Sequence, residues 1–291
     1  MKGGEAIVLS RSRKKTFFIY VFALVITVVV LAPVIWMFIT SVTYPKALTA
    51  LPLKLIPEEI TFERYINIFT GAGVSNPAYV FRVSMGNSLI IGFFVTLISL
   101  AVGSLAAYTF SRLRFRFKNS LILLTIFTYM IPPVALIIPM YTIFNSIGMV
   151  NRISGLVILY LSMVIPFIIW VMQGFFGNLS RSYEEAAEID GCNRFQTFYR
   201  IFLPIARPGL IATGLLAFLM SWDEFFFALI FTSNLDAKTI TVAISEFNGK
   251  YSVDYGMIST AGVIASVVPM LIVLIFQRYI VTGMTAGGVK E

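Results

Sequence analysis

The chain has 291 residues, of which 58% are hydrophobic and 12% are charged, and its formal net charge is +8. This composition excludes an ordinary soluble domain, in which about 25% of the residues are charged. The sequence contains no histidine and a single cysteine, Cys192, which excludes an internal disulfide bond and argues against a redox or zinc enzyme.

Long uncharged stretches recur along the chain, and apolar stretches of about 18 residues or more predict membrane-spanning helices. We interpret the chain as an all-α membrane protein of about six transmembrane helices. One membrane domain at 17–280 lies between an N-terminal tail at 1–16 and a C-terminal tail at 281–291. The first apolar run is too long for a secretory signal and no A-x-A cleavage pattern follows it, so it is predicted to be a retained span. The predicted spans are Phe17 to Thr40, Arg82 to Arg112, Lys118 to Arg152, Arg152 to Arg181, about Pro208 to Thr232, and Asp254 to Arg278.

Several of these spans contain proline, at positions 33, 132, 133, 139, 166 and 269. Membrane bundles tolerate such prolines when neighbouring helices or water satisfy the freed carbonyl groups. The prolines therefore predict bent helices, either around a pathway or as purely structural kinks.

Basic residues indicate the orientation, because lysine and arginine resist translocation across the membrane. With the N-terminus inside, most of the 22 basic residues fall in the inner segments, so both termini are predicted to be cytoplasmic. After the second span, Arg112, Arg114, Arg116 and Lys118 form a predicted cytoplasmic anchor. These cations flank spans instead of lining a soluble face, so nucleic acid is not an expected partner, whereas the lipid bilayer is.

The first predicted outer segment contains an amphipathic pattern. Thr61 is a candidate cap for a short helix whose Phe62, Tyr65, Ile66 and Phe69 recur at helical spacing. We expect this stripe to pack on the spans beneath it; docking of a partner is the alternative.

The inner segment at 178–208 holds four acidic and four basic residues after a series of apolar spans. Ser182 followed by Glu185 matches a capping box, so a helix is predicted to begin there. Gly191 is the predicted stop of that helix, since glycine adopts the left-handed conformation at no steric cost.

A second short helix is predicted to follow. Phe195, Phe198, Tyr199 and Phe202 would form one aromatic face of it. The pair Leu203-Pro204 would end it, because the residue before a proline avoids the α region. Pro208 suits the first turn of the next span. The sequence therefore predicts two short helices that project from the inner face of the membrane.

This segment resembles the EAA loop of permease subunits of bacterial and archaeal ABC importers. Two further stretches are similar to the carbohydrate (MalG-like, binding-protein-dependent) branch of that family: the C-terminal Phe276-Gln-Arg-Tyr279 with the tail at 283–290, and Trp222-Asp-Glu-Phe225. In the latter, Asp223 departs from the usual asparagine of the branch. The residues that match the EAA loop are Glu185, Ala186, Ala187, Asp190, Gly191, Ile201, Leu203 and Pro204.

The resemblance implies a type I ABC importer permease (MetI-like) fold in the cell membrane of a bacterium or archaeon. The implied partners are a second homologous permease, two ATPase subunits and an extracytoplasmic solute-binding protein. The EAA helix would be the coupling helix, with Glu185 in contact with the ATPase and Gly191 setting the bend. Glu185 could also simply cap its helix, and Asp190 could cap or contact a partner.

The sequence lacks the nucleotide-binding pattern G-x-x-x-x-G-K-[ST]. We therefore expect ATP and Mg to bind partner ATPase subunits, and no cofactor to bind this chain. No paired acid and base with a nucleophile and no metal cluster stand out, which makes a membrane enzyme the weakest hypothesis.

Asp223 and Glu224 are the acidic residues within the fifth predicted span. Intramembrane carboxylates indicate a pathway or a buried partner, so both residues, with Trp222, are candidates for the substrate pathway. A structural ion pair or an interfacial position is the alternative for the carboxylates, and a subunit interface for Trp222.

A secondary transporter coupled to an ion through these carboxylates would leave the EAA resemblance unexplained. The expected solute is a sugar or oligosaccharide, with polyols and glycerol phosphates as alternatives, and the sequence does not specify which.

Overall fold

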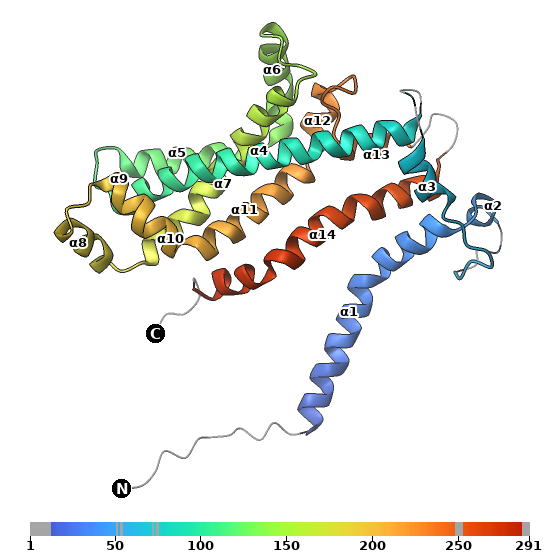
Figure 1. Cartoon of the computed structure of the whole chain (residues 1–291), viewed down its shortest axis with the longest axis horizontal. Coiled ribbons are helices and arrows are strands. Elements are labelled where there is room, and N and C mark those ends of the chain that lie inside the picture. Colours follow the sequence, from blue (N-terminus) through green and yellow to red (C-terminus); the bar gives the residue numbers. More distant parts are fainter. Residues whose placement is uncertain are drawn as a thin grey trace.

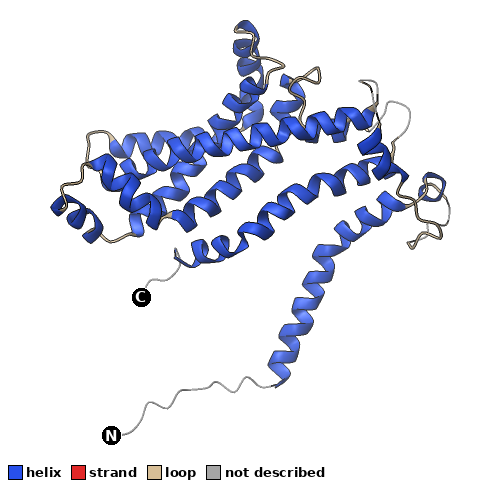
Figure 2. Cartoon of the chain, viewed as in Figure 1, coloured by secondary structure: helices blue, strands red, loops and turns tan. Residues whose placement is uncertain are grey.

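In the computed structural model, residues 13–50, 52, 55–71, 73, 76–247 and 253–286 are described, and they form helices joined by loops (Figure 2). The helices in chain order are α1 (Arg13–Val42), α2 (Pro45–Leu48), α3 (Glu63–Thr70), α4 (Pro77–Arg112), α5 (Lys118–Met130), α6 (Pro133–Ser146), α7 (Ile153–Asn178), α8 (Ser182–Ile189), α9 (Arg194–Thr197), the π-helical turn η1 (Phe198–Phe202), α10 (Leu203–Ile205), α11 (Arg207–Trp222), α12 (Phe226–Phe231), α13 (Ile240–Ser245) and α14 (Tyr255–Ala286). The all-α prediction is confirmed. The C-terminal part of α14 extends into the stretch predicted as a tail.

Four helices are long and apolar enough to cross a membrane, and two bent helix pairs raise the number of candidate spans to as many as six. The four are α1, α4, α7 and α14. They correspond to the first, second, fourth and sixth predicted spans, although α4 begins before Arg82 and α14 continues past Arg278.

The third predicted span is not one straight helix. α5 and α6 meet at an angle of 93°, and Figure 1 shows α6 projecting away from the bundle. The break lies at Ile131, which has an extended backbone, and is followed by Pro132 and Pro133. Ile131 precedes a proline and so avoids the helical region, which explains the break.

The fifth predicted span is also interrupted. α11 ends at Trp222 and α12 begins at Phe226, so Asp223 and Glu224 lie in the break instead of inside a continuous helix. α11 also meets the α9–α10 stretch at 81°. The predicted role of Pro208 at the start of this helix is confirmed, because it occupies the first turn of α11.

The main core joins α4, α7 and α11, and its largest fully buried side chains include Tyr160, Phe176 and Ile168. α4 and α7 pack closely because Gly103 has no side chain. A Cβ atom built there would lie 2.6 Å from Cγ2 of Ile168. Small residues of this kind let membrane helices approach one another.

α1 stands apart from this core (Figure 1). The most apolar part of α1 has no buried residue, and α1 contacts α14 near the end of the molecule that carries α2 and α3. There the Thr260 hydroxyl donates a hydrogen bond to the carbonyl oxygen of Ser41 at 3.3 Å. The helices α8 to α10 lie at the opposite end of the bundle, near the C-terminal end of α14.

α3 is the short helix predicted in the first outer segment, but the predicted packing of its apolar stripe is wrong. Phe62, Ile66 and Phe69 are each more than half exposed. The buried side of α3 instead presents Arg64, whose Nη1 donates to the carbonyl oxygens of Ser41 at 3.0 Å and Thr43 at 2.7 Å. The inward side of α3 therefore carries Arg64, which binds carbonyl groups at and just after the end of α1, together with the fully buried Ile68.

Candidate functional site

The helix α8 begins without the predicted capping box. Ser182 is the first helical residue, and the preceding Arg181 makes no side-chain cap. The hydroxyl of Ser180 accepts a hydrogen bond from the Ser182 amide at 3.2 Å, so the serine two residues earlier satisfies a free amide of the first turn. Glu185 therefore does not close a capping box and is exposed.

A capping box does form at the second short helix. The Asn193 side chain accepts from the Gln196 amide, and the Gln196 side chain accepts from the Asn193 amide, each at 2.9 Å. Asparagine is as good an N-cap as serine, and Gln196 occupies the third helical position that the box requires. The pattern was present in the sequence and was missed.

The turn between these two helices follows the prediction. Gly191 has φ of +73°, and the amide of Cys192 donates to the Ala187 carbonyl oxygen at 2.9 Å across the end of α8. This hydrogen bond closes a six-residue turn from Ala187 to Cys192, which the left-handed backbone of Gly191 permits. Asp190 occupies the C-cap position with its side chain exposed.

The second helical stretch runs from α9 through η1 and α10, and it continues past Pro204 to Ile205 instead of ending at Leu203. The π-helical turn at 198–202 explains this difference, with the Leu203 amide donating to the carbonyl oxygen of Phe198 five residues earlier. Proline clashes with the carbonyl group four residues before it in a regular α-helix, and the wider π turn relieves that clash.

The predicted aromatic face divides into two. Phe198 and Phe202 are buried, and each ring centroid lies 5.2 Å from that of Tyr108 in α4. Phe195 and Tyr199 are exposed and contact each other, with centroids 5.5 Å apart. Phe198 and Phe202 thus attach the stretch to the membrane helices, while Phe195 and Tyr199 are left exposed by the residues that the structure describes.

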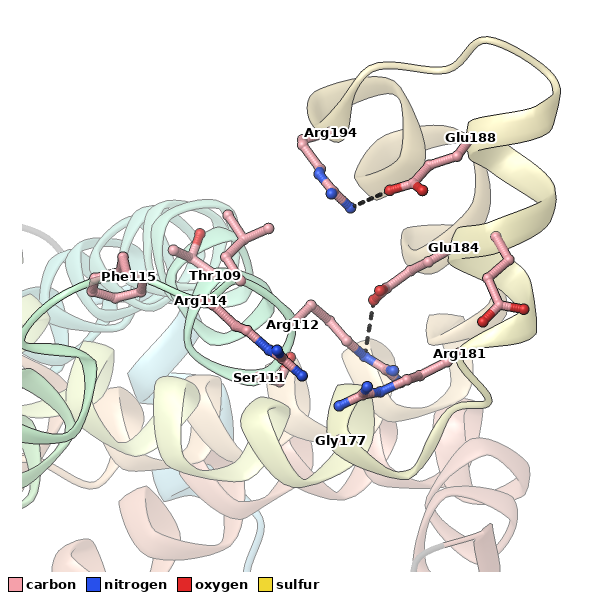
Figure 3. Close-up of a pocket in the computed structure, with 12 residues that line it drawn as sticks. Thr109, Ser111, Arg112, Arg114, Phe115, Gly177, Arg181, Glu184, Glu188 and Arg194 are labelled. Carbon is pink, nitrogen blue, oxygen red and sulfur yellow. Dashed lines mark ion pairs between the residues drawn. The ribbon is translucent and has the colours of Figure 1, made fainter.

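Arg112, the last residue of α4, connects α8 to the membrane helices (Figure 3). Its Nη2 donates to the carbonyl oxygens of Phe176 and Leu179 at the end of α7. Its Nε lies 3.5 Å from Oε1 of Glu184 in the first turn of α8, and the two side chains are only 6% and 17% exposed. The guanidinium group also lies 5.0 Å from the ring centroid of Phe202. The sequence located this arginine but did not indicate that Glu184 is its partner.

The residues of the EAA pattern take different positions. Ala187 is fully buried, whereas Glu185 and Ala186 are exposed on α8. Ile189 is 86% exposed and Phe195 is 62% exposed, although both are large apolar side chains. Ile201 and Leu203 are half-buried, and Pro204 is exposed.

The candidate pathway residues lie at the break between α11 and α12. Trp222 is 3% exposed, and its ring stacks on Phe218 with centroids 5.6 Å apart, so it presents no free face to a sugar ring in this conformation. Glu224 accepts hydrogen bonds from the amides of Phe227 at 2.9 Å and Ala228 at 3.1 Å. It therefore caps α12, and among the described residues neither it nor Asp223 forms an ion pair. Asp223 is exposed.

A helical membrane bundle with broken spans and a bent pair of short helices at one end has the fold of type I ABC importer permeases. The chain belongs to the family described as binding-protein-dependent transport system inner membrane component, whose sequence profile matches residues 99–286. The resemblance found in the sequence is thereby confirmed.

Named relatives and a solved structure agree with this family. The chain is 32% identical to the trehalose/maltose transport system permease protein MalG of Thermococcus litoralis, over 95% of this chain and 97% of that protein. It is 33% identical to the trehalose transport system permease protein SugB of Mycobacterium tuberculosis, over 96% and 99% of the two chains. A chain in the crystal structure of a bacterial ABC transporter involved in the import of the acidic polysaccharide alginate superposes with a TM-score of 0.75 at 25% identity, covering 92% of this chain and 98% of that one.

Proposed function

We propose that this chain is a pore-forming permease subunit of an ABC importer for a sugar or oligosaccharide, which an extracytoplasmic solute-binding protein delivers. ATP and Mg bind to separate ATPase subunits, since the sequence contains no phosphate-binding loop of the G-x-x-x-x-G-K-[ST] type. The chain itself is then a transport component and not an enzyme. Its termini and α8 lie on the cytoplasmic side, as the distribution of basic residues indicates.

The observation that carries this proposal is the exposed apolar surface at α8 and α9. In the described part of the chain Ile189 on α8 is 86% exposed and Phe195 on α9 is 62% exposed, and exposed large apolar side chains on a segment that projects from the bundle suit a protein interface. Arg112 joins the same segment to the ends of α4 and α7. A force applied to α8 by an ATPase would therefore reach two membrane helices through one buried side chain. Glu185, exposed on α8, is the polar contact that we assign to the ATPase.

A second homologous permease completes the pathway. The exposed surface of α1 and an apolar groove of about 630 Å³ support this assignment. The groove lies between α4, α11 and α14, and Leu97, Ile211 and Phe276 are among the residues that line it. Each chain would supply half of the pathway, and closure of the ATPases would rock the halves so that the cavity opens to one side at a time.

The proposed solute class comes from the relatives. Their names specify trehalose, maltose and, in the crystal structure, alginate, all of which are carbohydrates. This supports a sugar or oligosaccharide over the polyol and glycerol phosphate alternatives. Trp222 stacks on Phe218, and Glu224 caps α12. These contacts support a structural role for both residues in this conformation.

The test is uptake of radiolabelled maltose or trehalose into proteoliposomes that contain the complete transporter and its binding protein. We expect uptake that requires internal ATP. Uptake by this chain alone, driven by a proton or sodium gradient, would instead establish a secondary transporter.

Glu185→Lys tests the coupling role in the same system. Because Glu185 is exposed, the variant should insert and fold, yet sugar uptake should fall at least tenfold while ATP hydrolysis persists. Glu59→Lys, at an exposed glutamate in the opposite outer segment, is the matched control and should retain ATP hydrolysis coupled to uptake. Unchanged uptake in the Glu185 variant would remove the coupling assignment.

A further inference from the structure

A charged pocket of about 800 Å³ lies where α4, α7 and α8 approach one another (Figure 3). Four arginines and three glutamates line it. Two of the glutamates are engaged: Glu184 pairs with Arg112, and Glu188 pairs with Arg194 at 2.9 Å. The coupling segment and the membrane helices thus share one polar cavity.

Two arginines of this pocket remain without an acidic partner in the part of the chain that the structure describes. They are Arg114, in the loop after α4, and Arg181, directly before α8. Figure 3 shows their guanidinium groups directed toward that of Arg112, near Gly177. Like charges gathered in a cavity repel one another and favour the binding of an anion. Glu185 is the remaining carboxylate of the lining, so the unpaired charge of the pocket is positive.

The loop beside this pocket has the composition of a membrane interface. Phe115 and Phe117 are exposed beside Arg114 and Arg116, and the Arg116 guanidinium lies 5.0 Å from the Phe117 ring centroid. Aromatic and basic residues next to the end of a span are typical of the membrane interface. Phe117 also has φ of +67°, a conformation that bulky residues rarely adopt.

We propose that the pocket binds the phosphate group of an acidic phospholipid, held by Arg114 and Arg181. Arginine suits this ligand because its planar guanidinium forms paired hydrogen bonds with phosphate oxygens. The bound headgroup lies against the first turn of α8, since Glu184 and Glu185 line the same pocket. If α8 is the coupling helix of the proposed function, the lipid sets its position.

The test measures lipid binding and not transport, so a failure of the lipid proposal would leave the proposed function standing. The assembled transporter is purified with its partner subunits, and bound dioleoylphosphatidylglycerol is counted by native mass spectrometry. The double variant Arg114→Gln/Arg181→Gln should bind this lipid roughly 25-fold more weakly than the wild type, because each of the two basic residues near a membrane surface contributes about fivefold. Arg152→Gln, at an exposed arginine before α7, is the control and should bind as the wild type does.

A second variant and a comparison of ligands complete the test. A double lysine variant, Arg114→Lys/Arg181→Lys, keeps both charges but loses the paired hydrogen bonds, so it should bind more tightly than the glutamine variant and more weakly than the wild type. Binding by the lysine variant separates loss of the site from loss of assembly. Equal retention of phosphatidylglycerol in the glutamine variant, or equal retention of phosphatidylcholine by the wild type, would overturn the proposal. Displacement of the lipid by millimolar inorganic phosphate alone would assign the pocket to a soluble anion and likewise overturn it.

Discussion

The guanidinium group of Arg112 bridges three helices: its Nε lies 3.5 Å from Glu184 of α8, while its Nη2 donates to the carbonyl oxygens of Phe176 and Leu179 at the end of α7. Arg112 itself is the last residue of α4. The positions of α4, α7 and α8 are therefore linked through one side chain, and a displacement of α8 must either move the ends of both membrane helices or break this contact.

The first prediction concerns this contact. Arg112→Gln leaves the Glu184 carboxylate and two carbonyl groups without their partner, and loss of one member of a buried ion pair costs roughly 3 kcal/mol. We expect a lower thermal unfolding temperature of the purified complex and weaker coupling of ATP hydrolysis to uptake. The double variant Arg112→Gln/Glu184→Gln should lose less than the sum of the two single variants, because the residues are in contact. Additive losses would contradict the proposed link.

The second prediction concerns the turn after α8. Gly191 has φ of +73°, and a Cβ atom there would meet nothing within 4 Å, so the cost of Gly191→Ala is conformational and about 1 kcal/mol. Gly174 in α7 is the control, because a Cβ atom there also meets nothing within 4 Å and the position is helical. Gly174→Ala should be neutral or slightly stabilising in the same unfolding measurement. Equal behaviour of the two variants would show that the turn does not need glycine.

The third prediction concerns the contact between α4 and α7. In Gly103→Ala the new methyl group would lie 2.6 Å from Cγ2 of Ile168, so the helices must separate, at a cost of about 1–3 kcal/mol. Ile168→Val keeps the Cγ2 methyl group and should not recover the loss, whereas Ile168→Ala removes that atom and should cost less in the Gly103→Ala background than on its own. Gly86→Ala, at a position of α4 where a Cβ atom meets nothing, serves as the control. An unchanged unfolding temperature in the Gly103 variant would show that α4 and α7 are less closely packed than described.

These positions show how much of the molecule the sequence predicts. The spans follow from composition, and the turn at Gly191 follows from a purely local requirement, so both were predictable. The break at Ile131 is also local, since Pro132 and Pro133 follow it, although its angle of 93° depends on what the two halves pack against.

The missed features depend on contacts between distant parts of the chain. The exposed stripe on α3 is the clearest case, because helical spacing identifies an apolar face but not the side that faces inward. Arg64 takes the inner side because the carbonyl oxygens of Ser41 and Thr43, more than twenty residues earlier, accept its hydrogen bonds. The partnership of Arg112 with Glu184 likewise requires the ends of α4 and α7 to meet, which no local pattern encodes.

The fourth prediction separates the two carboxylates at the break in the fifth span. Glu224 accepts two amide hydrogen bonds at the start of α12, so Glu224→Ala should lower the free energy of unfolding by about 0.5–2 kcal/mol. Asp223 makes no comparable contact among the described residues, and Asp223→Asn should leave the unfolding temperature unchanged. If the Asp223 variant were the more damaging one, the structural assignment of Glu224 would be wrong.

The most direct test of the account is a photo-crosslink from Ile189, the 86% exposed side chain on α8. With benzoylphenylalanine at position 189 in the assembled transporter, we predict a crosslink to the ATPase subunit, identified by mass spectrometry of the product. The same probe at Ile66, exposed on α3 at the opposite end of the molecule, should give no ATPase crosslink. A probe at position 189 that reacts only with the extracytoplasmic binding protein, or with lipid alone, would contradict the coupling role of α8.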